Sequence, residues 1–262
     1  MLLRLDRRLI GGLVPALLAV SITAAVQFSG VFAADAGEAP KGYLGGVVAD
    51  FAVPPPPPPP GSAADQMDLV SVRAMKADVG TDGARDADAD ARAYMAPIIL
   101  PRFQEAAGTP LVPAERPILT RLLDEVIQEA GGVAARAKKA HPRQRPYVGN
   151  ADIKPCNATG LDGQASYPSG HAMNGYVVAQ ILAEVFPQRT QNVLARGILY
   201  GDRRVVCGVH YPLDVQQGRM LAIAYIAAVK ANPRFQSDLA CAKHEDAVAR
   251  KVEAALPEMC RK

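Results

Sequence analysis

Hydrophobic residues recur at helical spacing through most of the chain after residue 62. The clearest case is the segment 117–139, where apolar residues return every three or four positions and charged residues occupy the opposite face, as in an amphipathic helix. The same pattern predicts further helices over 65–76, 85–94, 171–186, 190–202, 214–231 and 245–256. No segment alternates apolar and polar residues over the length of a strand. The fold class is therefore predicted to be all-α, a compact helical bundle.

The first 33 residues have the pattern of a secretory signal peptide. A basic start over residues 1–8 is followed by an apolar run over 9–20 and then by small residues up to Ala33, the order of regions found in signal peptides. An uncleaved membrane anchor is the alternative, but polar residues interrupt the apolar stretch. No later stretch is apolar over the length that spans a bilayer. We therefore expect an exported protein, periplasmic or secreted, without stable membrane insertion.

The next segment, residues 34–62, is rich in alanine, glycine and proline and contains the unbroken run Pro54 to Pro60. Such a run adopts the polyproline II conformation, which has no internal hydrogen bonds. Three roles are open for it: a stiff spacer, a packed N-terminal arm, or a ligand for a proline-binding module. The predicted organisation is a signal peptide (1–33), this arm (34–62) and one helical domain (63–262).

Composition and charge exclude some classes of function. The chain is 49% hydrophobic and 21% charged, which is ordinary for a folded protein and excludes a mostly disordered one. The basic signal segment contributes most of the formal net charge of +3, so the remainder is nearly neutral. Because there is no Trp and only 5% aromatic residues, a nucleic-acid-binding surface is not expected. Any anion site must be local.

Four cysteines follow the signal segment: Cys156, Cys207, Cys241 and Cys260. An even number in an exported protein indicates disulfides. Three pairings are possible, and buried free thiols are the alternative. The spacings are not those of a zinc site.

Three short clusters carry the candidate chemistry, and one of them is Pro-Ser-Gly-His over 168–171. It stands directly before a predicted helix, where free backbone N–H groups and the positive end of the helix dipole can bind an anion. Gly170 would let a ligand approach the backbone closely, and Ser169 could cap the helix or donate its hydroxyl to a phosphoryl oxygen. The alternative is a plain serine cap beside an exposed His171.

Another cluster contains Arg204, His210 and Asp214. His210 and Asp214 are four residues apart, so on a helix they share a face and the carboxylate can reach one ring nitrogen. This contact would fix the tautomer and leave the other nitrogen free to attack. The planar fork of Arg204 suits a phosphate group. The alternatives are a surface His–Asp pair of small energetic value and a solvated arginine.

The remaining cluster precedes the other two and supplies cations, Lys138 at the end of a helix and Arg145 before Pro146. Its alternative explanation is a set of helix C-terminal charges that complement the helix dipole, followed by a basic loop. His141 lies between the two cations, and we assign it no role.

Together the clusters resemble the signature of the exported bacterial class A non-specific acid phosphatases. These belong to the type 2 phosphatidic acid phosphatase superfamily, which also includes vanadium-dependent haloperoxidases. The signature is Lys, six residues, Arg-Pro; then Pro-Ser-Gly-His; then Ser-Arg, five residues, His, three residues, Asp, and this sequence fits it in order and spacing. One position departs from it, because Arg203 stands where the family usually has serine. This change could alter hydrogen bonding at the pocket rim or the substrate preference.

The resemblance implies a role for each of these residues. His210 would be the nucleophile that forms a phosphohistidine, Asp214 would orient it, and His171 would serve as general acid and then as general base. The phosphate oxygens would be held by Lys138, Arg145, Ser169, Gly170 and Arg204. The resemblance also implies a helical bundle of the acid phosphatase and vanadium-dependent haloperoxidase type. It implies the disulfides Cys156–Cys207 and Cys241–Cys260.

The expected activity is hydrolysis of phosphomonoesters such as nucleotides, sugar phosphates and aryl phosphates at acidic pH. No metal or other cofactor is expected. Phosphotransfer to alcohols is a potential side activity, and a homo-oligomer is left open. Three other functions also stay open: a vanadate-dependent haloperoxidase, a lipid phosphate phosphatase, and a non-catalytic anion-binding envelope protein. Haloperoxidases are usually much longer, and the lack of later spanning segments is unlike a lipid phosphatase.

Overall fold

The computed structural model describes residues 42–45, 51 and 53–261, and the expected signal peptide over 1–33 lies outside them. The described residues form helices and connecting turns without a strand, so the all-α prediction is confirmed. The α-helices in chain order are α1 (Ala63–Asp78), α2 (Gly80–Arg92), α3 (Ala96–Ile99), α4 (Gln104–Ala107), α5 (Pro117–Ala140), α6 (Gly170–Val185), α7 (Thr190–Val206), α8 (Pro212–Val229) and α9 (Pro233–Ala249). Short 3-10 turns lie at η2 (Leu100–Phe103), η3 (Pro113–Glu115), η4 (Pro187–Arg189) and η5 (Glu258–Cys260).

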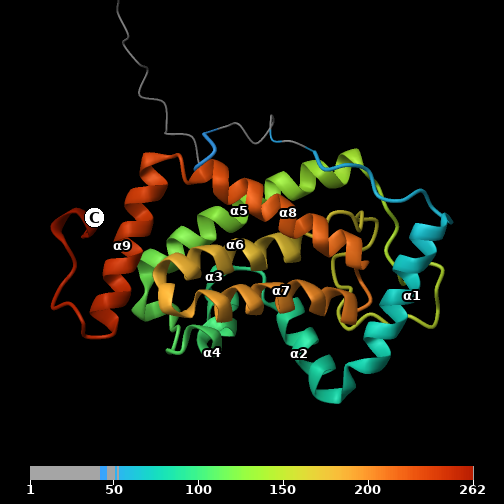
Figure 1. Cartoon of the computed structure of the whole chain (residues 1–262), viewed down its shortest axis with the longest axis horizontal. Helices are drawn as coiled ribbons and strands as arrows, with labels where there is room; N and C mark the ends of the chain where they lie inside the picture. The colour runs from blue at the N-terminus through green and yellow to red at the C-terminus, as the bar shows by residue number, and fades with distance from the viewer. Residues whose placement is uncertain (1–41, 46–50, 52, 262) are drawn as a thin grey trace, which may run out of the picture. The chain divides into compact units, whose positions relative to one another are not determined.

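Helix α6 is the centre of the packing. It contacts α5, α7, α8 and α9, and Figure 1 shows it running between α5 and α8 on one side and α7 on the other. Nearly every residue from Ala172 to Leu182 is buried, as expected of a helix enclosed on all sides. Two glycines permit the close approach of α6 and α7, because a Cβ atom at Gly175 would collide with Tyr200 and one at Gly197 with Ala179. The N-terminus of α6 is thereby held at a fixed place among its neighbours.

The prediction of a last helix over 245–256 is wrong. Helix α9 begins twelve residues earlier, at Pro233, and residues 250–255 are turns and bends. Asn232-Pro233 ends α8 as expected, but it also starts α9, because the Asn232 side chain accepts hydrogen bonds from the first backbone N–H groups and Pro233 occupies the first turn. The segment 96–107, for which no helix was predicted, forms α3, η2 and α4. Helix α2 starts at Gly80 rather than at residue 85.

The structure joins Cys156 to Cys207 and Cys241 to Cys260, the two pairs that the family resemblance implies. The first disulfide ties the long connection between α5 and α6 to the end of α7. The second ties the C-terminal segment to α9.

The described part of the N-terminal arm lies against the helical domain. Pro54 is buried, its carbonyl oxygen is 2.8 Å from His141 Nε2, and the Tyr167 hydroxyl donates a 2.6 Å hydrogen bond to the Pro55 carbonyl. Further back, the Tyr43 backbone N–H donates to the Glu129 carboxylate at 3.0 Å. Of the three roles left open for the proline run, these contacts favour the packed arm.

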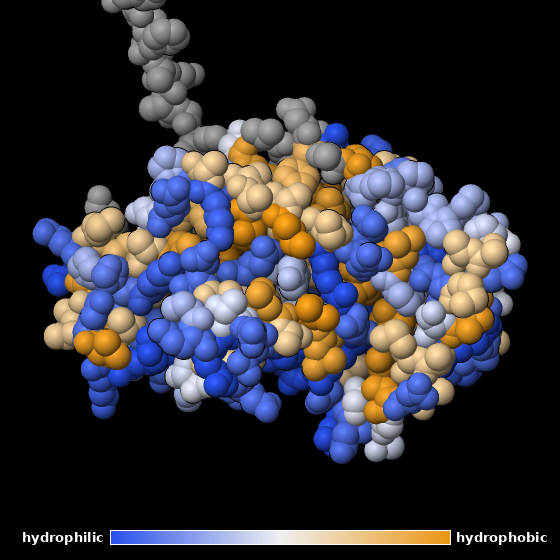
Figure 2. Space-filling view, viewed as in Figure 1, coloured by the Kyte–Doolittle hydropathy of each residue, from blue (hydrophilic) through white to orange (hydrophobic). Residues whose placement is uncertain are grey.

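The surface of the described residues mixes both kinds of side chain. Figure 2 shows hydrophilic and hydrophobic residues intermixed over the face in view. Among the helices that the structure describes, none combines the length and the apolar content that a bilayer crossing requires.

Candidate active site

The three sequence clusters converge at the N-terminal end of α6. Ser169 caps this helix, with its Oγ accepting a 3.2 Å hydrogen bond from Ala172 N, and its own backbone N–H donates to the Asp214 carbonyl at 2.9 Å. A Cβ at Gly170 would meet its nearest neighbour, Ala134 Cβ, only at 3.8 Å. Packing therefore does not require the glycine, and what its missing side chain provides is access to the helix N-terminus.

His210 and Asp214 pair, but not on one helix face as the spacing predicted. Helix α8 begins at Pro212, so His210 precedes it, and an extended Tyr211 turns the chain between them. The carboxylate reaches back from the first turn: Asp214 Oδ2 lies 3.4 Å from His210 Nδ1 and accepts a 3.0 Å hydrogen bond from Tyr211 N. Both side chains are buried, which excludes the alternative of a surface pair. This geometry leaves His210 Nε2 as the ring nitrogen that does not contact Asp214.

Two further residues hold the Asp214 carboxylate, and the sequence analysis missed both. The Ser166 hydroxyl donates to Oδ2 at 2.5 Å and lies 3.3 Å from His210 Nδ1, while Arg143 donates to Oδ1 at 2.8 Å. These donors compensate for removing a carboxylate from water. Arg143 stands inside the basic cluster and Ser166 just before the Pro-Ser-Gly-His motif, but no local spacing singles out either one.

Lys138 and Arg145 lie beside the imidazole. Arg145 Nη1 is 3.3 Å from His210 Nε2, and Lys138 Nζ donates to the carbonyl oxygens of Ala165 at 2.8 Å and Ser166 at 3.0 Å. The fold therefore places the two cations of the basic cluster next to His210.

Arg204 is buried in the last turn of α7, and its Nε and Nη1 atoms have no hydrogen-bond partner among the described residues; the same is true of Arg145 Nε. Buried donors of a charged group are rarely left unpaired, because each one costs free energy. These atoms are suited to an anionic ligand that would accept from them.

His171 is packed between aromatic rings rather than exposed. Its ring lies 4.9 Å from the Tyr94 ring and 6.2 Å from the Tyr200 ring, centroid to centroid, and its Nε2 is 3.1 Å from the Ala91 carbonyl oxygen. This backbone contact comes from α2, an element to which the sequence analysis gave no part in the site.

Several cationic and titratable groups lie close together at the site. Burial, together with Arg145 and Lys138, lowers the pKa of His210 well below its usual value, and burial with Arg204 does the same for His171. Burial and Arg145 lower the pKa of Lys138 to about 7, and burial lowers that of Arg204 to about 10. Burial and neighbouring positive charges both disfavour the protonated form of these groups. A bound anion would therefore be strongly favoured here.

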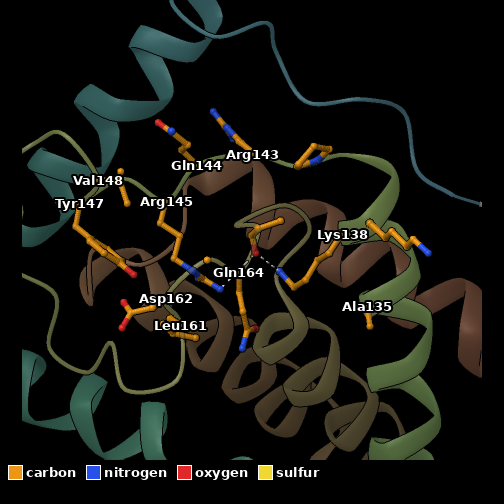
Figure 3. Close-up of a pocket in the computed structure, with 14 residues that line it drawn as sticks. Ala135, Lys138, Arg143, Gln144, Arg145, Tyr147, Val148, Leu161, Asp162 and Gln164 are labelled. Atoms are coloured by element: carbon orange, nitrogen blue, oxygen red, sulfur yellow. Dashed lines mark hydrogen bonds between the residues drawn. The ribbon is translucent and has the colours of Figure 1, made fainter.

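A cavity of about 680 Å³ opens beside these cations. Lys138 and Arg145 form part of its wall, and Figure 3 shows their side chains pointing toward each other from α5 and the loop that follows it. Tyr147 and Leu161 add apolar surface and Gln164 adds an amide. The volume is that of a small-molecule site.

Arg203, the residue that departs from the family signature, does not join this group. Its Nη1 donates to Asp90 Oδ2 at 2.7 Å and its Nη2 to Asp86 Oδ2 at 2.6 Å. The described hydrogen bonds of Arg203 therefore go to α2, not to the residues that are expected to bind phosphate.

The chain is similar to known phosphatases. The family model described as the PAP2 superfamily matches residues 119–237, which include all three clusters. A non-specific acid phosphatase of Providencia stuartii is 35% identical over 175 residues, covering 66% of this chain and 68% of that protein. An acid phosphatase of Zymomonas mobilis is 38% identical over 56% of each chain, and a non-specific acid phosphatase of Salmonella typhimurium is 34% identical over 55% of this chain and 58% of that protein.

Proposed function

Since this chain is a phosphatase of the PAP2 superfamily, we propose that it hydrolyses phosphomonoesters through a phosphohistidine intermediate on His210. One observation carries the proposal: the buried imidazole of His210 has Nδ1 beside Asp214 and Nε2 beside Arg145. An imidazole held in this way presents a lone pair on Nε2 where a phosphate group would be bound.

In the first half-reaction, the Nε2 lone pair of His210 forms a bond to phosphorus as the bond from phosphorus to the leaving oxygen breaks. His171 donates a proton to that oxygen, and the alcohol leaves. The Nδ1 proton of His210 stays directed at the Asp214 carboxylate, whose negative charge stabilises the imidazole as it becomes positive.

In the second half-reaction, water attacks phosphorus while His171, now neutral, accepts a proton from it. The bond between nitrogen and phosphorus breaks, inorganic phosphate is released, and Nε2 recovers its lone pair. An alcohol in place of water would give phosphotransfer by the same step, and this is the side activity we propose.

The charge of the transferring phosphoryl group would be neutralised by Lys138, Arg145 and Arg204, and by Ser169 and Gly170 at the start of α6. Phosphoryl transfer depends mainly on such positioning and charge stabilisation. The unpaired buried donors of Arg204 and Arg145 support this assignment. We propose that no metal is needed, so a chelator would leave the rate unchanged.

An acidic pH optimum follows from the environment of His171. Burial and Arg204 lower the pKa of His171, so its protonated form is present in the empty site only in acid. The negative charge of a bound phosphate would raise that pKa. Loss of the general acid as the pH rises would therefore lower turnover.

Export is the proposed location. The signal-peptide pattern of residues 1–33 supports it, and so do the two disulfides, because such bonds persist in oxidising compartments.

The deciding experiment compares purified His210→Ala and His171→Ala with the unchanged protein. We expect His210→Ala to lose turnover and the alkali-stable phosphoenzyme that radiolabelled substrate would form. We expect His171→Ala to lose most activity on phenyl phosphate, whose phenol is a poor leaving group, and least on p-nitrophenyl phosphate, whose nitrophenol is a better one. His141→Ala is the matched control, since His141 contacts the proline arm instead. Turnover by His210→Ala at the rate of the control would refute the mechanism.

A further inference from the structure

A buried carboxylate near the end of α2 holds three arginines. Asp90 is fully buried, and it accepts hydrogen bonds from Arg102 Nε at 2.8 Å, Arg196 Nη2 at 2.7 Å and Arg203 Nη1 at 2.7 Å. Arg196 and Arg203 belong to α7 and Arg102 to η2. Asp90 is therefore the point at which α2 is fastened to α7.

The residues directly after Asp90 form one wall of the His171 environment. The Ala91 carbonyl oxygen is 3.1 Å from His171 Nε2, and the Tyr94 ring lies 4.9 Å from the His171 ring. The Ala93 carbonyl accepts a hydrogen bond from the Tyr200 hydroxyl, and the Tyr200 ring stacks on His171 at 6.2 Å between centroids. The histidine therefore contacts a backbone segment that directly follows Asp90 in the chain.

We propose that Arg203, through its ion pair with Asp90, is a positioning residue for His171. The pair fixes the end of α2 so that the Ala91 carbonyl keeps a hydrogen bond from His171 Nε2. Because Nε2 keeps its proton for that carbonyl, Nδ1 is the atom that exchanges a proton with the leaving oxygen and then with water. This inference rests on the proposed role of His171 as general acid.

This contact depends on the residue that departs from the family signature. Position 203 is where the family signature usually has serine, and a serine side chain is too short to reach both Asp90 and Asp86 as Arg203 does. Arg203 is also the neighbour of Arg204 on the last turn of α7. Its pairing with Asp90 therefore fixes the spacing between the element that supplies a phosphate ligand and the segment that orients the acid.

The serine variant is a usable test because Asp90 would keep two of its three arginine partners. In Arg203→Ser, Oδ1 of Asp90 still accepts hydrogen bonds from Arg102 and Arg196, and only Oδ2 loses its arginine. By contrast, replacing Asp90 would leave three arginines without their shared partner, and loss of one member of a buried ion pair is strongly destabilising. The arginine is therefore the side to change.

The experiment measures kcat/KM on a series of aryl phosphates of increasing leaving-group pKa. We expect Arg203→Ser to lose about tenfold on phenyl phosphate and less than about twofold on p-nitrophenyl phosphate, because a misplaced general acid matters most for a poor leaving group. Arg203→Lys should recover most of the loss, since lysine can still reach Asp90. The inhibition constant of inorganic phosphate should not change. Arg92→Ser is the matched control, as it removes an exposed α2 arginine that pairs with Asp88 and not with Asp90.

An equal loss on all substrates, or no loss on any, would overturn the proposal, because a merely structural contact does not alter the leaving-group dependence. If Arg203→Ser does not fold, the same substrate series is measured with Arg203→Gln. Glutamine keeps a donor for Asp90 but removes the charge of the ion pair. His171→Ala is measured alongside. If His171→Ala itself shows no leaving-group dependence, the proposed general acid is wrong, which is a different outcome from failure of Arg203 to position it.

Discussion

The buried carboxylate of Asp214 orients His210, the proposed nucleophile. Arg143 donates to one of its oxygens and Ser166 to the other, and His210 Nδ1 lies beside the second. Because these dipoles and charges are in place before any substrate binds, little reorganisation would be needed when His210 becomes positive. Ser166 lies within 3.3 Å of the imidazole as well, so it helps to fix the ring plane.

Lys138 gives a pH prediction at the same scale. Burial and the neighbouring Arg145 lower the pKa of Lys138 to about 7, so it is charged below that pH and neutral above it. We expect the KM for a phosphomonoester to rise as the pH increases from 6 to 8, because one phosphate-binding charge is lost from the free enzyme. In Lys138→Arg the charge persists, and this rise should be smaller.

The measurement is the ratio of KM values for the variant and the unchanged protein at each pH, since the ionisation of the substrate affects both alike. Lys154→Arg, at an exposed position of the connection between α5 and α6, is the control and should follow the unchanged protein. A ratio that stays constant across this interval would show that the Lys138 charge does not control substrate binding.

At the scale of elements, the side chain of Arg143 links α1 to the site. Arg143 donates to Asp65 at 2.7 Å and to Asp68 at 2.9 Å, both on α1, and to Asp214 on α8 at 2.8 Å. Its guanidinium also lies 3.7 Å from the centre of the Tyr211 ring. Helix α1 and the orientation of His210, the proposed nucleophile, are therefore coupled.

We predict that Arg143→Gln lowers the free energy of unfolding by about 3–5 kcal/mol, because it leaves the buried Asp214 and the half-buried Asp65 and Asp68 without their shared cation. It should also lower kcat, since Asp214 loses the partner of Oδ1. Chemical denaturation and steady-state kinetics measure the two effects. Arg73→Gln removes an α1 arginine that pairs with Asp152 in solvent, and it should leave both quantities unchanged. If Arg143→Gln is as stable as the unchanged protein, the ion pairs of Arg143 do not stabilise the fold and this prediction is wrong.

The elements and the site differ in how far sequence predicts them. Helix α5 is predicted to within one residue of its end because its apolar spacing and Pro117 are local signals. The start of α9 was missed because Asn232-Pro233 is at once a stop and a start. Likewise, the motifs and their spacing predict that His171 and His210 belong to one site. They do not reveal Arg143, whose α1 partners lie 75 and 78 residues away in the chain; only the tertiary fold shows such pairs.

Over the whole molecule, the two disulfides serve different regions. Cys156–Cys207 joins the connection that carries Arg143 and Arg145 to the end of the helix that carries Arg204. Cys241–Cys260 joins α9 to the C-terminal segment, on helices that contribute none of the proposed site residues. Both constrain the unfolded chain, but only the first spans the candidate site.

Removing each bridge should therefore separate stability from activity. The closed loops differ, with sequence separations of 51 and 19 residues, so loop entropy gives losses of about 4 kcal/mol for Cys156→Ser with Cys207→Ser and about 3 kcal/mol for Cys241→Ser with Cys260→Ser. At a temperature well below the unfolding midpoint of either variant, we expect kcat to fall only in the variant without Cys156–Cys207. Only this disulfide links the segment that carries Arg145 to the helix that carries Arg204. Thermal melts and kinetics at one low temperature measure both quantities. Equal kcat in the two double variants would mean that helix packing alone holds the site together, and the first bridge would then contribute to stability only.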